Sequence, residues 1–373
     1  MQTLEGNREE VRLGIIGTGR VGQSRMKTYA GIEGARIVAC ADVNEVGSRR
    51  IAEAHGVAHV YASFRDLLAR DDIDAVDICL HNNFHMPVTL AALAAGKHVH
   101  CEKPMAGSYR DAEAMLVAAR ERGRLLHVEL SSMYSDETLA ARELIAQGEV
   151  GAIYHARSTG FRRRGRPYVD GHGTAPFVQK RQSAGGALYD MGTHHIAQLL
   201  YLLDTPRVVR VSGAIYQATD MDERRRHASG YDVEELGVGL VRFAAGVTLD
   251  IVEAWAAHLD AFGGSVLLGA KGGIRLKPFG FFKSAGHLDI DGTVDLERAR
   301  RRFDQVRGDA GVFASSAAHF VAALQGKVEL LPTAELALAT MLITEGVYLS
   351  GELGREVTAE EIVTRSMPCA LEP

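Results

Sequence analysis

Short apolar runs alternate with amphipathic stretches over the first third of the chain. This alternation is typical of parallel β-strands joined by crossover helices. The clearest helix covers 109–122, because Ser108 and Asp111 resemble a capping box and Gly123 supplies a stop. The expected strands are short and apolar, and they cover 12–16, 36–41, 75–80, 97–101 and 125–129. The pattern predicts a doubly wound α/β sheet.

The pattern changes after about residue 130. A helix over 136–146 leads into strand-like segments that no helix separates, at 153–161, 208–217, 236–243, 247–255 and 265–276. Consecutive strands with short turns predict an α+β domain with a large, open, mostly antiparallel sheet. Residues 283–311 are polar and indicate a surface excursion, and helices over 312–324 and 333–349 close the chain. We expect two domains, 1–131 and 132–373, and the closing helices are free to pack on either.

Composition narrows the function classes. The chain has 373 residues, 24% of them charged, and a formal net charge of −5, which argues against a nucleic-acid partner. Its four cysteines form no CxxC pair, so we expect a reduced, cytoplasmic setting without structural zinc. We expect no secretory signal and no membrane partner, because the start is charged and apolar runs are short.

A glycine-rich loop follows the first expected strand. In GxGxxG the glycines permit a tight turn, close approach of a pyrophosphate and close packing of helix on strand. Asp42 ends the next strand, where its carboxylate suits ribose hydroxyls and repels a 2′-phosphate. The first domain is therefore predicted to be a Rossmann domain that binds NAD, with NADP less favoured. The expected loop contacts are Gly17, Thr18, Gly19, Arg20, Val21 and Gly22.

Glu102 and Lys103 directly follow the strand expected over 97–101. They therefore lie at the carboxyl edge of the sheet, where ligands of such folds bind. A lysine there can donate to a reacting hydroxyl and favour its alkoxide. The alternative is a turn lysine that only contacts solvent.

Asp190 and His194 are four residues apart before an apolar helical stretch. On a helix they share one face, so the carboxylate would orient the imidazole and raise its basicity, as a general base requires. His195 points about 100° away and is expected to serve a different proton. The alternative is a buried Asp–His pair without chemistry.

Four arginines, at positions 162, 163, 164 and 166, follow the first strand of the second domain. We interpret most of them as a solvated loop, and we expect Tyr168 behind them to contact the substrate. A metal site from neighbouring histidines is not expected, since no HExxH-type spacing is present.

Together, GTGRVG, Asp42, CEKP and GGALYDMGTHH resemble the Gfo/Idh/MocA family of NAD(P)-dependent oxidoreductases over essentially the whole chain. The resemblance implies that Lys103, Asp190 and His194 act on the substrate, with His195 in reserve as the base, and that no metal is used. Two departures stand out. The family's TPN-x-x-H segment keeps only Asn82 and His85, and its Asn-Arg-Arg segment is Leu130-Ser131-Ser132.

The resemblance implies oxidation of a secondary hydroxyl on a sugar, cyclitol or glycoside by hydride transfer to NAD. Cofactor contacts are expected from Asn82, His85, Glu102 and Lys103, besides the loop and Asp42. Substrate contacts are expected from Lys103, Tyr168, Asp190, His194 and His195. The alternatives are an NAD-dependent glycoside hydrolase working through transient C3 oxidation, and a non-catalytic sensor. The open sheet face favours a homodimer or homotetramer.

Overall fold

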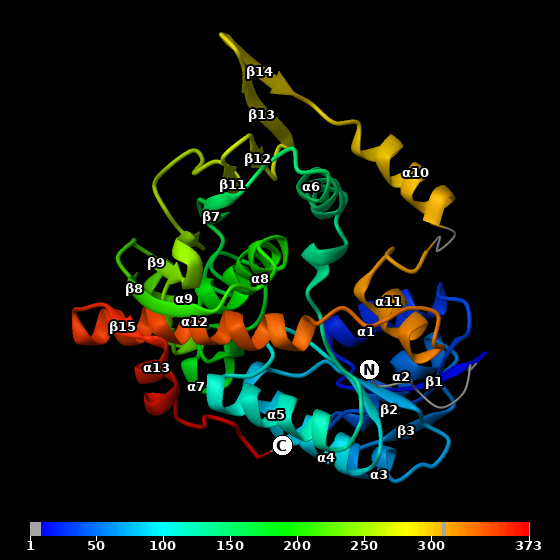
Figure 1. Cartoon of the computed structure of the whole chain (residues 1–373). Helices are drawn as coiled ribbons and strands as arrows, with labels where there is room; N and C mark the ends of the chain where they lie inside the picture. The colour runs from blue at the N-terminus through cyan, green and yellow to red at the C-terminus, as the bar shows by residue number, and fades with distance from the viewer. Residues whose placement is uncertain (1–8, 308–310, 373) are drawn as a thin grey trace.

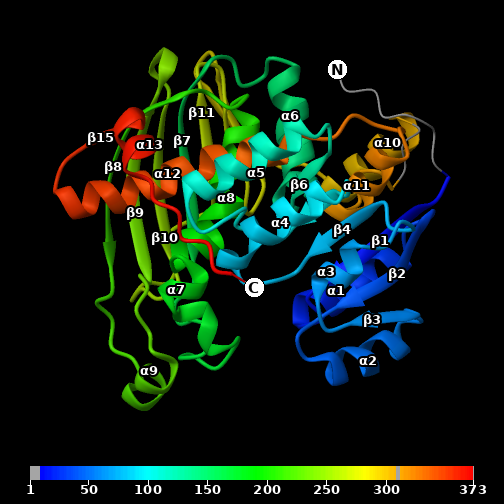
Figure 2. The same ribbon diagram turned by 90° about the horizontal axis from the view of Figure 1, so that it is seen from below.

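The computed structural model describes residues 9–307 and 311–372, and it contains two sheets. Sheet A has six strands in the order β3-β2-β1-β4-β5-β6, all parallel. Figure 2 shows sheet A beside the larger sheet B, with the helices of each domain packed around them. The predicted doubly wound sheet is confirmed, with its strands at β1 (Val11–Ile16), β2 (Ala35–Ala41), β3 (His59–Tyr61), β4 (Ala75–Ile78), β5 (His98–Cys101) and β6 (Leu126–Val128).

The helices of this domain cover both faces of sheet A, as crossover connections require. The sequence pattern did not predict β3, because it is only three residues long and none of them is buried. Short helical segments η1 (Asn82–Phe84) and η2 (Ser131–Tyr134) follow strands β4 and β6. The main helices are α1 (Arg20–Ala30), α2 (Glu45–Ala54), α3 (Phe64–Leu68), α4 (His85–Ala94) and α5 (Tyr109–Glu121).

Sheet B has nine strands in the order β14-β13-β12-β11-β7-β10-β9-β8-β15. Only β7 and β10 run parallel; the other neighbours are antiparallel, which confirms the predicted open, mostly antiparallel sheet. The predicted strand over 265–276 is two strands joined at Gly269–Gly272. The strands are β7 (Ile153–Phe161), β8 (Val208–Tyr216), β9 (Leu236–Phe243), β10 (Thr248–Ala254), β11 (Val266–Gly269), β12 (Gly273–Arg275), β13 (Gly280–Ala285), β14 (Leu288–Gly292) and β15 (Val357–Thr358).

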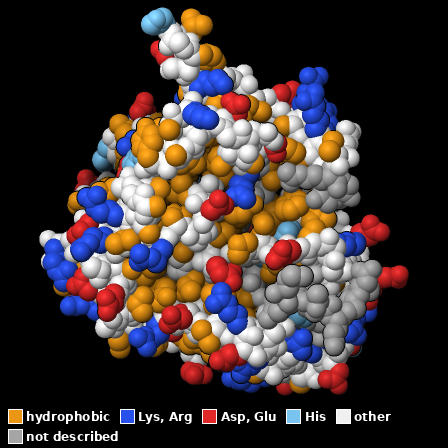
Figure 3. All heavy atoms as spheres, in the orientation of Figure 1, with side chains coloured by type: hydrophobic (Ala, Val, Ile, Leu, Met, Phe, Trp, Pro, Cys, Tyr) orange, Lys and Arg blue, Asp and Glu red, His pale blue; other side chains and the backbone are white. Residues whose placement is uncertain are grey.

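The segment predicted as a surface excursion contains the β13–β14 hairpin and helix α10 (Leu296–Arg307). The hairpin projects from the body at the top of Figure 1, and the same projection stands clear in Figure 3. Leu288 at its tip is 67% exposed and most of β14 is exposed, so β14 lacks the buried apolar face from which strands are predicted. The remaining helical segments are α6 (Asp136–Ala146), η3 (Ala175–Val178), α7 (Lys180–Ser183), η4 (Leu188–Gly192), α8 (Thr193–Leu202), α9 (Glu223–Ser229), η5 (Ala244–Gly246), α11 (Ser316–Leu324), α12 (Thr333–Leu353) and α13 (Ala359–Arg365).

Helix α12 joins the two domains. It packs on β8 and β9 of sheet B and on α5 and β6 of the first domain, and its first residue, Thr333, accepts a hydrogen bond from Val128 N at 3.0 Å. It is long and apolar enough to cross a membrane by length and composition, yet half of its apolar window is buried inside the protein. Helix α11 packs on α1 of the first domain. Both closing helices therefore contact the dinucleotide-type domain.

Candidate active site

The glycine-rich loop has room for a phosphate where the motif requires it. Gly17 has a φ of +93°, and a Cβ there would lie 2.4 Å from the carbonyl oxygen of Cys79. A Cβ on Gly22 would lie 2.0 Å from the carbonyl oxygen of Gly17, whereas one on Gly19 meets nothing within 4 Å. Helix α1 begins at Arg20, and Gly19 offers its first N–H groups no side-chain cap. These free N–H groups and the open space beside Gly19 fit a pyrophosphate.

Asp42 directly follows β2 and contacts the glycine-rich loop at Thr18. Its Oδ2 accepts hydrogen bonds from Thr18 N at 2.8 Å and Thr18 Oγ1 at 3.2 Å, and its Oδ1 accepts one from Asn44 N at 2.9 Å. Each oxygen keeps further acceptor capacity for a ribose hydroxyl. The loop and Asp42 thus fit the adenosine half of NAD.

Lys103 and Asp190 meet across the two domains. Lys103 Nζ donates to Asp190 Oδ1 at 2.8 Å and to the Asp190 carbonyl oxygen at 2.9 Å. Asp190 Oδ2 accepts from Trp255 Nε1 at 2.9 Å and lies 3.4 Å from Arg162 Nη1. Burial alone would raise the pKa of Asp190, but Lys103, with Arg162 and Trp255, holds it well below its usual range. Asp190 is therefore a carboxylate that fixes the lysine.

The predicted pairing of Asp190 with His194 is wrong: no hydrogen bond joins them within the described residues, and both oxygens of Asp190 have other partners. The prediction rests on the helix that carries both residues, whereas Asp190 bonds to Lys103 and Trp255 on other elements. His194 Nδ1 is instead buried with no hydrogen-bond partner among the described residues. Burial and the nearby Lys103 charge lower the pKa of His194 to about 3, so its imidazole is neutral.

The carboxylate–imidazole pair of this region belongs to His195. Its Nδ1 lies 3.0 Å and 3.2 Å from the two carboxylate oxygens of Glu253 on β10, and Ser158 Oγ donates to Glu253 at 2.7 Å. Burial lowers the pKa of His195, but the Glu253 charge outweighs it and raises the pKa above its ordinary value. A Cβ on Gly160 would lie 1.9 Å from Glu253 Oε2 and 2.8 Å from His195 Cε1, so only glycine fits beside the pair.

His85 has no exposed surface with which to contact a cofactor, contrary to the prediction. Its side chain is fully buried, with Nδ1 2.8 Å from the Pro104 carbonyl oxygen and Nε2 3.1 Å from that of Leu80. It ties the loop after β4 to the loop that carries Lys103. Asn82 donates to the Ser183 carbonyl oxygen at 2.6 Å across the domains, and its contact with a cofactor stays a prediction.

The loop of arginines is only partly solvated, so our interpretation needs correction. Arg162 reaches Asp190, as described above, and Arg166 is 1% exposed and bonded to Asp170 and Glu235. Asp170 is only four residues from Arg166 in the sequence, but Glu235 and Asp190 are distant, and nothing in the sequence near the arginines indicates them. Arg163 and Arg164 are exposed, as expected.

Tyr168 lies in the same loop with a left-handed φ of 60°. The guanidinium of Arg225 lies over its ring, 4.7 Å from the centroid, and donates to its carbonyl oxygen at 2.8 Å. The neighbouring cavity of about 530 Å³ is lined by charged side chains, among them Arg164, Asp170 and Arg225. Contact of Tyr168 with a substrate stays a prediction.

The Rossmann sheet carries an NAD-type loop, and a lysine at its carboxyl edge is held by a carboxylate of the second domain. These features define the class of nicotinamide-dependent oxidoreductases. Residues 11–130 match the oxidoreductase family with an NAD-binding Rossmann fold, and residues 138–275 match the Gfo/Idh/MocA C-terminal domain. The chain belongs to the Gfo/Idh/MocA family, which confirms the resemblance, the enzyme class and NAD as the cofactor.

Relatives of known activity act on sugars and cyclitols. D-glucoside 3-dehydrogenase of Escherichia coli K12 is 28% identical over 355 residues, which cover 93% of this chain and 97% of that protein. Inositol 2-dehydrogenase of Klebsiella pneumoniae is 35% identical over 145 residues, covering 38% and 43% of the two chains. Levoglucosan dehydrogenase, solved with NADH and levoglucosan, superposes with a TM-score of 0.76 at 19% identity over 94% of this chain and 99% of that one. The hydrolase alternative is not favoured by these relatives.

Proposed function

We propose that this protein oxidises a secondary hydroxyl of a glycoside, sugar or cyclitol to a ketone, reversibly, with NAD in preference to NADP. The C3 hydroxyl of a glucoside is the first candidate, because the glucoside 3-dehydrogenase matches nearly the whole chain. The observation that carries the proposal is Lys103, fixed by Asp190 at 2.8 Å, beside the neutral imidazole of His194, whose pKa the lysine charge lowers. A charged donor and a neutral imidazole are what a reacting hydroxyl needs to lose its proton.

In this proposal Lys103 Nζ donates to the reacting oxygen and stabilises its developing negative charge. Asp190 holds the lysine in place, and the neutral imidazole of His194 accepts the hydroxyl proton. NAD, bound over the glycine loop, supplies the hydride acceptor. Lys103 provides the positive charge at the reacting oxygen, so the reaction as proposed needs no metal ion. His195 contributes a second imidazole on the substrate side, held by Glu253.

The test is an NAD-linked absorbance screen over aryl glycosides, free hexoses and inositols. Net NADH formation on one of these classes supports a dehydrogenase. Release of the free sugar without net NADH would support the hydrolase instead. NAD binding with no reaction on any polyol would favour a sensor.

We also propose a cytoplasmic homo-oligomer. The four cysteines are all unpaired, consistent with a reducing compartment. Sheet B leaves a shallow hollow of about 390 Å³ over β8, β9 and β10, lined by Ala214, Val238 and Val252 among others. A second copy of the chain would cover this apolar face, and light scattering in solution would distinguish a dimer or tetramer from the monomer.

A further inference from the structure

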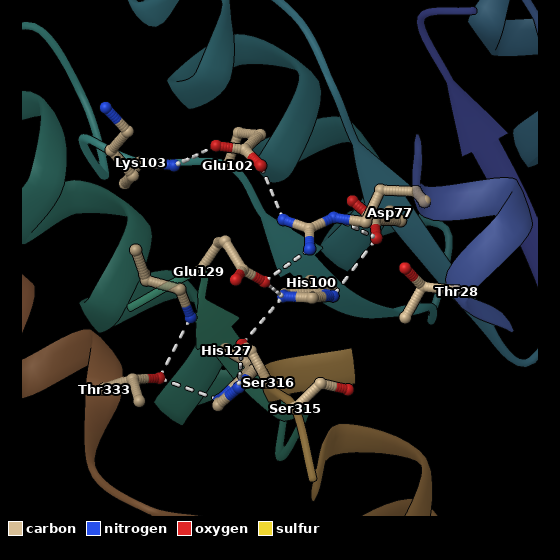
Figure 4. A network of polar contacts seen from close by, with 12 residues as sticks. Thr28, Asp77, His100, Glu102, Lys103, His127, Glu129, Ser315, Ser316 and Thr333 are labelled. Carbon is tan, nitrogen blue, oxygen red and sulfur yellow. Dashed lines mark hydrogen bonds and ion pairs between the residues drawn. The ribbon is translucent and has the colours of Figure 1, made fainter. Parts of the chain in front are cut away.

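A buried cluster of charges lies beneath Glu102, and the sequence patterns gave no sign of it (Figure 4). Its centre is Arg25 on α1, whose side chain is 11% exposed. The guanidinium contacts three carboxylates: Glu102 at 2.5 Å, Glu129 at 2.6 Å and Asp77 at 3.3 Å. One arginine therefore joins the strands β4, β5 and β6 near their carboxyl ends.

His100 supplies the second cation of the cluster. Its ring is fully buried, 3.1 Å from Asp77 and 3.0 Å from Glu129. Burial lowers the pKa of His100, but these carboxylates outweigh burial and raise it to about 9, so the imidazole is charged near neutral pH. With Arg25, the cluster holds two positive charges against three carboxylates. The sum is one negative charge when all three carboxylates are ionised.

Glu102 is the carboxylate of this cluster that titrates most readily. Burial and the neighbouring Glu129 raise its pKa, whereas Asp77 and Glu129 have pKa values below their usual range. Arg25 opposes this rise by donating to Oε1, and the backbone N–H of Lys103 donates to Oε2 at 3.1 Å. Arg25 therefore favours the ionised form of Glu102.

The cluster cannot easily rearrange, because both domains hold it. Ser316 of α11 lies 3.3 Å from His100 and 2.9 Å from His127, and Thr333 of α12 lies 2.8 Å from the other nitrogen of His127. Figure 4 shows this chain of contacts running from Lys103 and Glu102 to Thr333. Its charges are preorganised, so they respond little when a ligand charge changes.

Glu102 directly follows β5 and precedes Lys103, at the edge where a parallel sheet of this type binds its cofactor. The nicotinamide ring is cationic when oxidised and neutral when reduced. We propose that Arg25 holds Glu102 ionised at this edge, and that this charge strengthens binding of the oxidised form of NAD relative to the reduced form. The proposal rests on the proposed function only for the identity of the cofactor.

The test compares the dissociation constants of NAD⁺ and NADH by calorimetry, without any substrate. In Glu102→Gln we expect NAD⁺ binding to weaken about ten-fold relative to NADH, the size expected for one unit charge acting over roughly 10 Å at an effective dielectric constant of about 20. Arg25→Met, in which Glu102 would take up a proton, removes one positive and one negative charge, so the net charge of the cluster stays the same and the ratio should change less than in Glu102→Gln. In the unchanged protein the preference for NAD⁺ should fall as the pH is lowered, whereas in Glu102→Gln it should not depend on pH.

The matched control is Arg12→Gln. Arg12 also forms a bidentate pair on sheet A, with Asp74 at 2.8 Å and 3.0 Å, but at the amino end of β1, and the ratio should not change. Equal weakening of both cofactor forms in Glu102→Gln would reduce the cluster to a structural role and overturn the inference, as would an unchanged ratio. Glu102→Gln decides the matter if Arg25→Met fails to fold. If the protein without any substitution bound neither NAD⁺ nor NADH, this result would contradict the proposed function itself.

Discussion

Replacement of Lys103 by methionine removes the one charged donor that the proposed mechanism directs at the reacting oxygen. Loss of a single preorganised donor of this kind costs about 2.7–4 kcal/mol in the transition state, or roughly a hundred- to thousand-fold in turnover. The effect on folding should be smaller. Asp190 would lose the contact at 2.8 Å but keep Trp255 at 2.9 Å, and its side chain is 25% exposed to water. We expect a stability loss of about 1–2 kcal/mol, below the 3–5 kcal/mol of a fully buried broken pair.

The assay is NADH formation with the best substrate of the screen, combined with calorimetric NAD binding. Trp255, the chain's only tryptophan, donates directly to Asp190, so its fluorescence reports whether the site remains intact. The matched control is Lys97→Met. Lys97 lies just before β5, and its Nζ donates to the carbonyl oxygens of Arg70 and Ile73. This substitution should lower stability and leave turnover nearly unchanged. Turnover of Lys103→Met close to that of the unchanged protein, with NAD still bound, would refute the proposed role of the lysine.

Three further outcomes are expected. Asp42→Ser should increase the ratio of NADP to NAD affinity about ten-fold or more by removing a charge that repels a 2′-phosphate, as competition binding would show. Glu253→Gln should lower the pKa of His195, as NMR titration would show. In the unchanged protein the pKa of His195 is raised by folding, so the pair stabilises the fold fully below about pH 6.5. This stabilisation is lost as the pH rises through the folded-state pKa. Gly22→Ala should abolish NAD binding or destabilise the fold, because its Cβ would lie 2.0 Å from the backbone oxygen of Gly17, and thermal unfolding with and without NAD separates the two.

The strands of both sheets could be predicted where they are buried, because burial imposes an apolar pattern on the sequence. Strands β1, β4 and β5 are nearly fully buried and stand out as apolar runs. Strand β14 carries no such pattern, since the β13–β14 hairpin projects from the body and most of β14 is exposed. The π-turn η4 was also beyond prediction, because its residues continue directly into α8 without a cap or breaker to mark it.

The residue types of the site could be predicted, but their partners could not. Local spacing suggested that Asp190 pairs with His194, whereas Asp190 bonds to Lys103, 87 residues away, and His195 bonds to Glu253, 58 residues away. A buried charge needs an opposite charge wherever the fold brings one, and helical periodicity contains no information on which strand will supply it. Gly160 is a sign of the buried pair that can be seen in the sequence. The His195–Glu253 pair fills the space that a side chain at position 160 would need, so a glycine stands there. A glycine inside a buried strand therefore deserves a search for the side chains that occupy its place.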